Sequence, residues 1–231
     1  MSAGPLVVSA HALDTGGGDG LVADAAVFAE LDCRAVCVAT SVVSREPLPV
    51  EVLARQLEAA QLVGPVGAAR IGFVKGATQV ELIAGFVRRV APATAVVASP
   101  LLDSETHEAI RRHLYPAARV VVVRAADLAS LADRTIEDLD VLRGAALQLR
   151  EQGARAVVVA GWLVRGRVLD LLDDDGQVVL LDTARIQVPR IPGLAGAYAA
   201  ALAAHLARGL PLSTAVEAAQ RYVGFRLVRG R

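Results

Sequence analysis

The stretch that decides the fold is Pro192-Gly193-Leu194-Ala195-Gly196-Ala197-Tyr198-Ala199-Ala200-Ala201-Leu202-Ala203-Ala204-His205-Leu206-Ala207-Arg208-Gly209. It predicts a glycine loop followed by an alanine-rich helix that stops at Gly209, two residues before Pro211. The first turn of such a helix has unpaired amides and the positive end of the helix dipole, so Gly193, Leu194, Ala195 and Gly196 are predicted to form an anion-binding loop. The alternative is a core helix whose small residues only allow close packing against a sheet.

Upstream of this stretch, short apolar runs alternate with amphipathic segments. This pattern predicts a mostly parallel sheet with helices on both faces, a three-layer α/β/α sandwich. The predicted strands are Leu6–Ala10, Ala35–Ser41, Ala68–Val74, Ala95–Ala98, Arg119–Val123 and Ala156–Ala160. The predicted helices are Leu21–Leu31, Val50–Leu62, Gln79–Val90, Ser104–His113 and Thr135–Gln152.

The pattern changes near the end of the chain. Val164–Leu172 and Gln177–Asp182 flank an Asp-Asp-Asp-Gly turn at 173–176, which predicts a late β-hairpin with a solvated turn rather than a metal site. Two helix starts follow from capping residues. Thr135, with Asp138 three residues later, predicts one N-cap, and Ser213 predicts the N-cap of a last helix that ends at Tyr222.

Composition limits the class of protein. A chain of 231 residues with 54% hydrophobic content can bury one large core, so residues 1–231 are predicted to form a single domain. The 24 basic and 24 acidic residues balance, which gives no support for nucleic-acid binding. Lys75 is the only lysine, so the chain has no Gly-x-x-x-x-Gly-Lys-Ser/Thr phosphate loop.

Location and cysteine chemistry are read from the same sequence. No run of about 18 apolar residues suggests a membrane span, and no basic leader precedes the first strand, so a cytoplasmic protein is predicted. Cys33 and Cys37 have neither zinc-site nor redox-motif spacing, and both are predicted to be small buried residues. No metal site is predicted.

A second glycine loop, Asp14-Thr15-Gly16-Gly17-Gly18-Asp19-Gly20, follows the first strand. Ligands of open parallel sheets bind beyond the carboxyl ends of the strands, so Asp14, the Gly16–Gly18 loop, Asp24 and the Gly193–Gly196 loop are predicted to converge on one cleft there. Asp14 and Asp24 favour a polar ligand, because buried carboxylates are costly unless they are paired or used. The alternative is that each is an acid near a helix N-terminus.

Three segments carry a family resemblance. Residues 14–24, Asp-Thr-Gly-Gly-Gly-Asp-Gly-Leu-Val-Ala-Asp, resemble the Asp-x-x-Gly-Gly-Ala-Gly-Ile-Gln-Ala-Asp signature of hydroxymethylpyrimidine and phosphomethylpyrimidine kinases. Arg70-Ile71-Gly72-Phe73 is similar to the family's Lys-Ile-Gly-Met, and Gly193–Val216 to its Gly-Thr-Gly-Cys loop with the two segments that follow. The resemblance implies a ribokinase-like fold, with ATP and Mg²⁺ used to phosphorylate a thiamine-precursor pyrimidine.

The departures from the family pattern fall at the catalytic positions. Gly196 aligns with the Cys or Asp that accepts the hydroxyl proton, and glycine cannot act as a base, so no catalytic residue is assigned. Ser99 aligns with a residue that helps to place magnesium. The segments around Ala125 and Ala160 lack the family's nucleotide-, metal- and phosphate-contacting side chains.

The predicted pyrimidine pocket is altered rather than erased. Asp24 aligns with the family's pyrimidine-binding Asp, while Arg45 and Phe73 replace its Gln and Met. The substrate-binding set implied in this way is Asp14, Gly16, Gly17, Asp24, Arg45 and Phe73. Arg190, just before the helix loop, is a further candidate for an anion contact.

Three functions remain open. One is an active kinase whose base is water or a carboxylate such as Asp19. The second is a non-catalytic protein that binds a pyrimidine, a phosphate or another small anion. The third is a protein that acts through a homodimer surface after its pocket has been filled. A weakly active or inactive family member is favoured, because phosphoryl transfer does not survive the combined loss of base, metal ligands and phosphate-contacting lysine.

Overall fold

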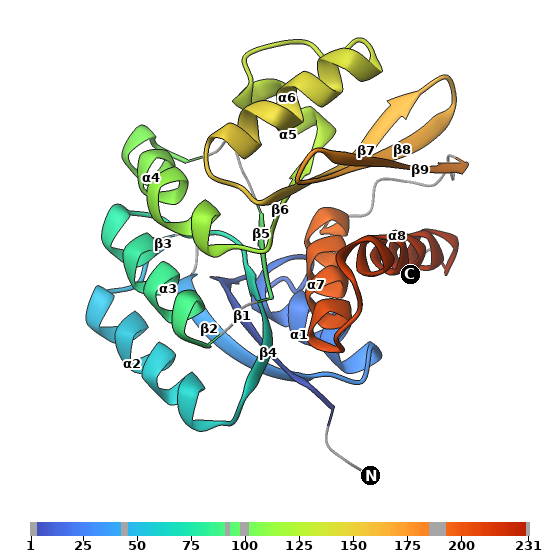
Figure 1. Cartoon of the computed structure of the whole chain (residues 1–231). Coiled ribbons are helices and arrows are strands. Elements are labelled where there is room, and N and C mark those ends of the chain that lie inside the picture. The colour runs from blue at the N-terminus through green and yellow to red at the C-terminus, as the bar shows by residue number, and fades with distance from the viewer. Residues whose placement is uncertain (1–3, 43–45, 91–92, 98–101, 185–192, 230–231) are drawn as a thin grey trace.

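The computed structural model describes residues 4–42, 46–90, 93–97, 102–184 and 193–229, and Figure 1 shows their arrangement. Within these residues a nine-stranded sheet has the order β3-β2-β1-β4-β5-β6-β7-β8-β9. The strands are β1 (Leu6–Leu13), β2 (Arg34–Val42), β3 (Glu46–Pro47), β4 (Val66–Ile71), β5 (Thr94–Val97), β6 (Val120–Arg124), β7 (Ala156–Val164), β8 (Arg167–Asp174) and β9 (Gln177–Ala184).

The sheet is parallel from β2 through β1, β4, β5 and β6 to β7. β3 pairs antiparallel with β2, and β7, β8 and β9 form an antiparallel ribbon. The β8–β9 connection is the predicted hairpin, whose loop residues Asp175 and Gly176 have φ of 52° and 83°, the angles of a type I′ turn. The mostly parallel α/β sheet with a late hairpin is therefore confirmed.

Helices cover both faces of this sheet (Figure 1). One apolar cluster joins the sheet to α1, α7 and α8, and the other joins it to α2 through α6. The α-helices are α1 (Gly20–Glu30), α2 (Val50–Leu62), α3 (Ala77–Val90), α4 (Ser104–Ala109), α5 (Ala125–Leu131), α6 (Leu139–Glu151), α7 (Leu194–Ala207) and α8 (Leu212–Arg229). This is the predicted three-layer sandwich.

The alanine-rich helix α7 lies against β4 and β5, with residues 197–204 buried. Its small side chains allow this close approach, since a Cβ added at Gly67 of β4 would lie only 3.1 Å from the Ala207 carbonyl oxygen. The helix ends in a Schellman motif, in which Gly209 (φ 81°) donates to Leu206 and Leu210 donates to His205. The predicted alanine body and glycine stop are confirmed, but Leu194, Ala195 and Gly196, predicted as part of a loop, form the first turn of α7, and Gly193 is its N-cap.

Several predicted helix boundaries are wrong. α6 begins at Leu139, because the Asp138 side chain accepts a hydrogen bond from the Val141 amide, so Asp138 and not Thr135 is the N-cap. α8 begins at Leu212 and continues to Arg229, which places Ser213 inside the first turn. The segment predicted as one helix at 104–113 divides into α4, a π-helical turn (Ile110–Leu114) and a 3₁₀ turn (Tyr115–Ala117).

Two further expectations need correction, and one helix was missed. Cys33 is buried, but Cys37 on β2 is exposed. Asp173 is only 5% exposed and accepts hydrogen bonds from Arg150 and from the Gly176 amide, so the acidic turn is only partly solvated. α5 was not predicted, because its short Ala-Ala-Asp-Leu-Ala-Ser-Leu sequence carries no clear helical period.

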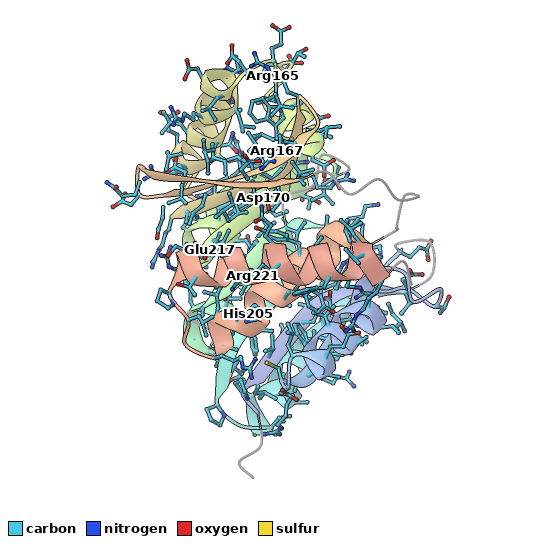
Figure 2. The ribbon with its side chains drawn as sticks, turned by 90° about the vertical axis from the view of Figure 1, so that its right-hand side faces the viewer. Arg165, Arg167, Asp170, His205, Glu217 and Arg221 are labelled. Atoms are coloured by element: carbon cyan, nitrogen blue, oxygen red, sulfur yellow. The ribbon has the colours of Figure 1, made fainter. Side chains whose placement is uncertain are left out.

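The antiparallel ribbon contains a buried carboxylate. Asp170 of β8 is 3% exposed and accepts a hydrogen bond of 2.7 Å from the Gly161 amide. Burial raises the pKa of Asp170, while Gly161, Gln220 and Tyr198 act against the rise. Figure 2 shows Asp170 at the ribbon above α8.

No described helix is long and apolar enough to cross a membrane.

Candidate functional site

The two glycine loops lie directly against each other at the carboxyl end of β1. A Cβ added at Gly193, the N-cap of α7, would collide with the carbonyl oxygen of Gly18. Gly193 has a φ of 74°, so both its backbone angle and its surroundings require glycine. The predicted juxtaposition of the two loops is confirmed.

Asp14 braces the first of these loops. Its Oδ1 accepts a hydrogen bond of 3.0 Å from the Gly16 amide, and its Oδ2 accepts one of 3.3 Å from the Asp19 amide. The Asp14 carbonyl oxygen also accepts from the Gly17 amide, which closes a turn at the exposed glycines. These bonds account for the Asp14 carboxylate within the loop, so its presence alone does not point to a ligand.

Asp24 of α1 is paired inside the protein with Arg70 of β4. The Ser9 hydroxyl donates a hydrogen bond of 2.6 Å to Asp24 Oδ2, and Arg70 Nε lies 3.3 Å from the same oxygen. Both charged side chains are 1% exposed. Because Arg70 supplies a counter-charge from the chain itself, the burial of Asp24 alone does not point to a polar ligand.

Arg70 was not assigned to the site from the sequence. Two signals were available: an arginine within the otherwise small and apolar strand Val66–Ile71, and its match to the lysine of the family's Lys-Ile-Gly-Met segment. A charged side chain placed in a buried strand needs a partner nearby. The sequence could not show that this partner was Asp24.

The buried pair leaves several hydrogen-bonding groups unused. Among the described residues, Asp24 Oδ1, Arg70 Nε and Arg70 Nη1 have no hydrogen-bond partner. A Cβ added at Gly72 would collide with Arg70 Nη1 and with the His11 ring, so the glycine makes room for the guanidinium. The guanidinium therefore fills the space beside Asp24.

His11 connects this pair to the glycine loop. Its Nδ1 accepts hydrogen bonds from the amides of Ala12 and Phe73, and its Nε2 lies 3.7 Å from Asp19 Oδ1. Burial lowers the pKa of His11, and the nearby Arg70 charge lowers it further. The proximity of the His11 imidazole, more than any other group, holds the pKa of Asp19 well below its usual range, so Asp19 is ionised at neutral pH.

The Asp19 carboxylate lies where a side chain at position 196 would stand. A Cβ added at Gly196 would lie 2.6 Å from Asp19 Oδ1 and 3.4 Å from Arg70 Nη2. An anionic group therefore already faces the first turn of α7, where the helix dipole favours negative charge. Asp19 is half-buried, with 48% of its side chain exposed.

Of the remaining predicted residues, some belong to the described part of the chain and some do not. Phe73 is half-buried, and its carbonyl oxygen accepts a hydrogen bond of 2.5 Å from the buried Thr40 hydroxyl. Arg45, Ser99 and Arg190 lie outside the described residues, so their predicted contacts are not tested. Ala160 pairs with Arg124 in the β6–β7 ladder.

Metal-ligating side chains do not cluster in the described part of the chain. No group of three His, Cys, Asp or Glu side chains that could hold a metal ion occurs in the described part of the chain. Asp127, the acid beside Ala125, takes hydrogen bonds from Arg124 on both of its oxygens, at 2.5 and 2.6 Å. A carboxylate neutralised in this way is a poor ligand for Mg²⁺, which binds through carboxylate and phosphate oxygens.

The cavity found near α7 lies away from these loops. It measures about 530 Å³, and it is lined by residues after the last turn of α7, including Leu210, and by the Arg119–Asp174 ion pair. The glycine loops meet at the first turn of the same helix. None of the residues predicted to bind substrate lines this cavity.

Comparison with solved structures defines the class of protein. The fold matches a pyridoxal kinase from Staphylococcus aureus in complex with AMP-PCP and pyridoxal, with a TM-score of 0.88 and 26% sequence identity over 96% of this chain and 87% of the other. It also matches a structure described as the last common ancestor of HMPPK and PLK/HMPPK vitamin kinases, with a TM-score of 0.80 and 26% identity over 97% and 100% of the two chains. The fold is that of a ribokinase-like vitamin kinase.

Sequence comparison gives the family. The phosphomethylpyrimidine kinase model matches residues 14–229. A hydroxymethylpyrimidine/phosphomethylpyrimidine kinase from Synechococcus elongatus is 30% identical over 95% of this chain and 90% of its own length, and one from Streptomyces coelicolor is 29% identical over 98% and 90%. The chain belongs to the phosphomethylpyrimidine kinase family, as its motifs predicted.

Proposed function

We propose that this family member has little or no hydroxymethylpyrimidine kinase activity and that it binds a small ligand without phosphorylating it. The observation that carries the proposal is the Asp24–Arg70 pair, in which both side chains are 1% exposed. The resemblance implies that Asp24 would bond the amino group of a pyrimidine. Here Arg70 takes that carboxylate and fills the adjoining space.

The substitutions at the chemical positions support the same proposal. Loss of a general base costs about 10²–10⁴ in rate, and Gly196 cannot supply one. Ala125 and Ala160 offer no polar side chain in place of the nucleotide- and phosphate-contacting groups that the family implies. Loss of electrostatic stabilisation adds to the loss of the base, although such effects need not be additive.

A coupled ADP-release assay tests the proposal, with hydroxymethylpyrimidine and its monophosphate as substrates. We expect no substrate-dependent turnover by the unmodified protein or by the Gly196→Cys variant. A Gly196→Cys/Asp19→Ala variant is included, since an added Cβ at Gly196 would lie 2.6 Å from Asp19 Oδ1. Turnover by the unmodified protein in the usual enzymatic range, about 1 per second or more, would contradict the proposal.

ATP is the first ligand to test. The S. aureus pyridoxal kinase, 26% identical to this chain, was solved with ADP and with AMP-PCP. A thermal-shift titration with ATP, with and without Mg²⁺, measures binding without turnover, because a ligand that binds only the folded state raises the melting temperature. Inorganic phosphate in the same titration separates binding of the anion from binding of the nucleoside.

The second candidate function is an active kinase that uses Asp19 as the proton acceptor. It is favoured by the position of Asp19 Oδ1, 2.6 Å from a Cβ built at Gly196. A general base loses its effect when its carboxylate becomes an amide, so Asp19→Asn is then expected to lower kcat by about 10²-fold or more. Asp175→Asn, a matched change in the remote β8–β9 turn, should leave kcat unchanged.

A homodimer and a cytoplasmic location remain part of the proposal. Light scattering coupled to size-exclusion chromatography gives the mass in solution directly. A measured mass equal to that of a single chain, at micromolar protein concentration, would contradict the proposed homodimer.

A further inference from the structure

The group paired with the Asp24 carboxylate is the guanidinium of Arg70. A guanidinium is a planar N–C–N group, and its geometry matches that of a carboxylate. An amino-substituted pyrimidine presents a similar planar edge, with a ring nitrogen and an exocyclic amino group on the same carbon. Arg70 therefore brings to Asp24 the same type of group that such a ligand would bring.

We propose that Arg70 is a specificity-determining residue of this site, whose guanidinium acts as a built-in amidine that excludes amidine-bearing ligands from Asp24. The inference rests on the proposed function, because it explains why a site of this family would not take its pyrimidine. It assigns the exclusion to one side chain.

Packing supports the assignment. Arg70 is among the largest side chains that are fully buried, and it forms the ion pair recorded for Asp24 within the described residues. Space for its Nη1 depends on Gly72, and its Nη2 lies 3.4 Å from the Cβ position of Gly196. The side chain thus runs from Asp24 towards the first turn of α7, across the region where a ligand would bridge the two.

Incomplete hydrogen bonding also supports it. Asp24 Oδ1, Arg70 Nε and Arg70 Nη1 remain without hydrogen-bond partners among the described residues, so the two groups form an ion pair at 3.3 Å that leaves hydrogen-bonding capacity on both. Removal of the Arg70 guanidinium would leave Asp24 as a buried carboxylate with an unpaired oxygen. It would also leave a space the size of a planar N–C–N group beside that carboxylate. Such a carboxylate strongly favours a new cationic or amidine partner.

Chemical rescue of an Arg70→Ala variant tests the inference. The probes are guanidinium and acetamidine ions, at millimolar concentrations far below the molar range in which guanidinium denatures proteins, and 4-amino-5-hydroxymethyl-2-methylpyrimidine. We expect each probe to raise the melting temperature of Arg70→Ala but not that of the unmodified protein. Calorimetric affinity for the pyrimidine should rise by about tenfold or more over the unmodified protein.

Two controls locate the binding. Arg70→Ala/Asp24→Asn has the same space without the carboxylate, and it should lose the response to all three probes. Arg119→Ala removes the guanidinium from another Arg–Asp pair, the one with Asp174, whose side chains are about one-third exposed. That variant should show no response, because a solvated carboxylate needs no new partner.

Every outcome decides the inference. The inference is overturned if Arg70→Ala folds but binds none of the probes. It is also overturned if Arg70→Ala/Asp24→Asn binds the probes as well as Arg70→Ala does. If Arg70→Ala does not fold, Arg70→Lys retains a cation and frees the guanidinium space, and its failure to bind the pyrimidine overturns the inference instead. Turnover of the pyrimidine by the unmodified protein would defeat the proposed function, whereas a failed rescue without such turnover defeats only this inference.

Discussion

Single residues of the site are understood only through their partners. Asp24 would be an unpaired buried carboxylate if it were considered on its helix alone, and Arg70 an unpaired cation on its strand. Together, at 3.3 Å, they neutralise each other. Buried pairs of this kind add little net stability, but removal of one partner costs about 3–5 kcal/mol.

The pH dependence of stability gives a prediction for His11. Its pKa is lowered in the folded protein by burial and by Arg70, so below about pH 6.5 the unfolded chain binds more protons than the folded one. Stability is therefore expected to fall as the pH drops from about 6.5 towards the folded pKa. His11→Gln, which removes the titrating group, should reduce that fall.

Urea unfolding between about pH 5 and 7.5 checks this prediction, since carboxyl groups contribute most below that range. Asp19, whose pKa is held low by His11, contributes stability that is lost only at more acid pH. Equal pH slopes for the unmodified protein and His11→Gln would contradict the prediction.

At the scale of elements, the candidate site lies at the first turn of α7, and a Schellman motif at Gly209 ends the same helix. Gly209 has a φ of 81° and donates its amide hydrogen to Leu206, while an added Cβ would meet nothing within 4 Å. Only the left-handed backbone angle therefore disfavours alanine. Gly209→Ala is expected to lower the free energy of unfolding by about 1 kcal/mol.

Gly224 in α8 is the matched control. It also has open space around its Cβ position, but it lies within a helix. Gly224→Ala should raise stability by about 0.5–1 kcal/mol, because alanine is the better helix former. Urea titration measures both variants, and the same sign of change for the two would contradict this account.

Element boundaries depend on local hydrogen bonds that compete closely. Thr135 and Asp138 are both acceptable N-caps by residue type, and the chain uses Asp138, whose side chain accepts from the Val141 amide. Pro211 directly precedes α8, so that helix starts one residue before Ser213. Sequence patterns predicted that these helices exist, but not which neighbouring residue begins them.

At the scale of the whole molecule, one sheet supports both apolar clusters. Adjacent residues of the same strand belong to opposite clusters, as Leu171 and Leu172 of β8 do. Loss of the sheet would expose both clusters together. The single domain predicted for residues 1–231 should therefore unfold in one cooperative transition.

Trp162 is the only tryptophan and belongs to the cluster on the α2–α6 face, so its fluorescence reports that side alone. Far-ultraviolet circular dichroism reports all the helices. Coincident urea transitions by the two probes are expected for a single domain. A fluorescence transition well separated from the dichroism transition would contradict the prediction.

The sequence by itself determined the layer order, the parallel sheet, the hairpin and the family. These follow from hydrophobic period, glycine positions and turn residues, which act over a few neighbouring residues and can be read along the chain. The closeness of the two glycine loops could also be predicted, because parallel strands bring their carboxyl ends to one edge of the sheet. Gly196, at the position where the family resemblance implies a proton acceptor, was visible in the same way.

Only the tertiary structure decided what fills the site. Arg70 reaches Asp24, and Asp19 takes the space beside Gly196, through contacts between segments far apart in the chain. Burial, not residue type, gives these contacts their energetic weight, because a charge costs little in water and much in a core. Local pattern carries no information about which distant group meets a buried charge.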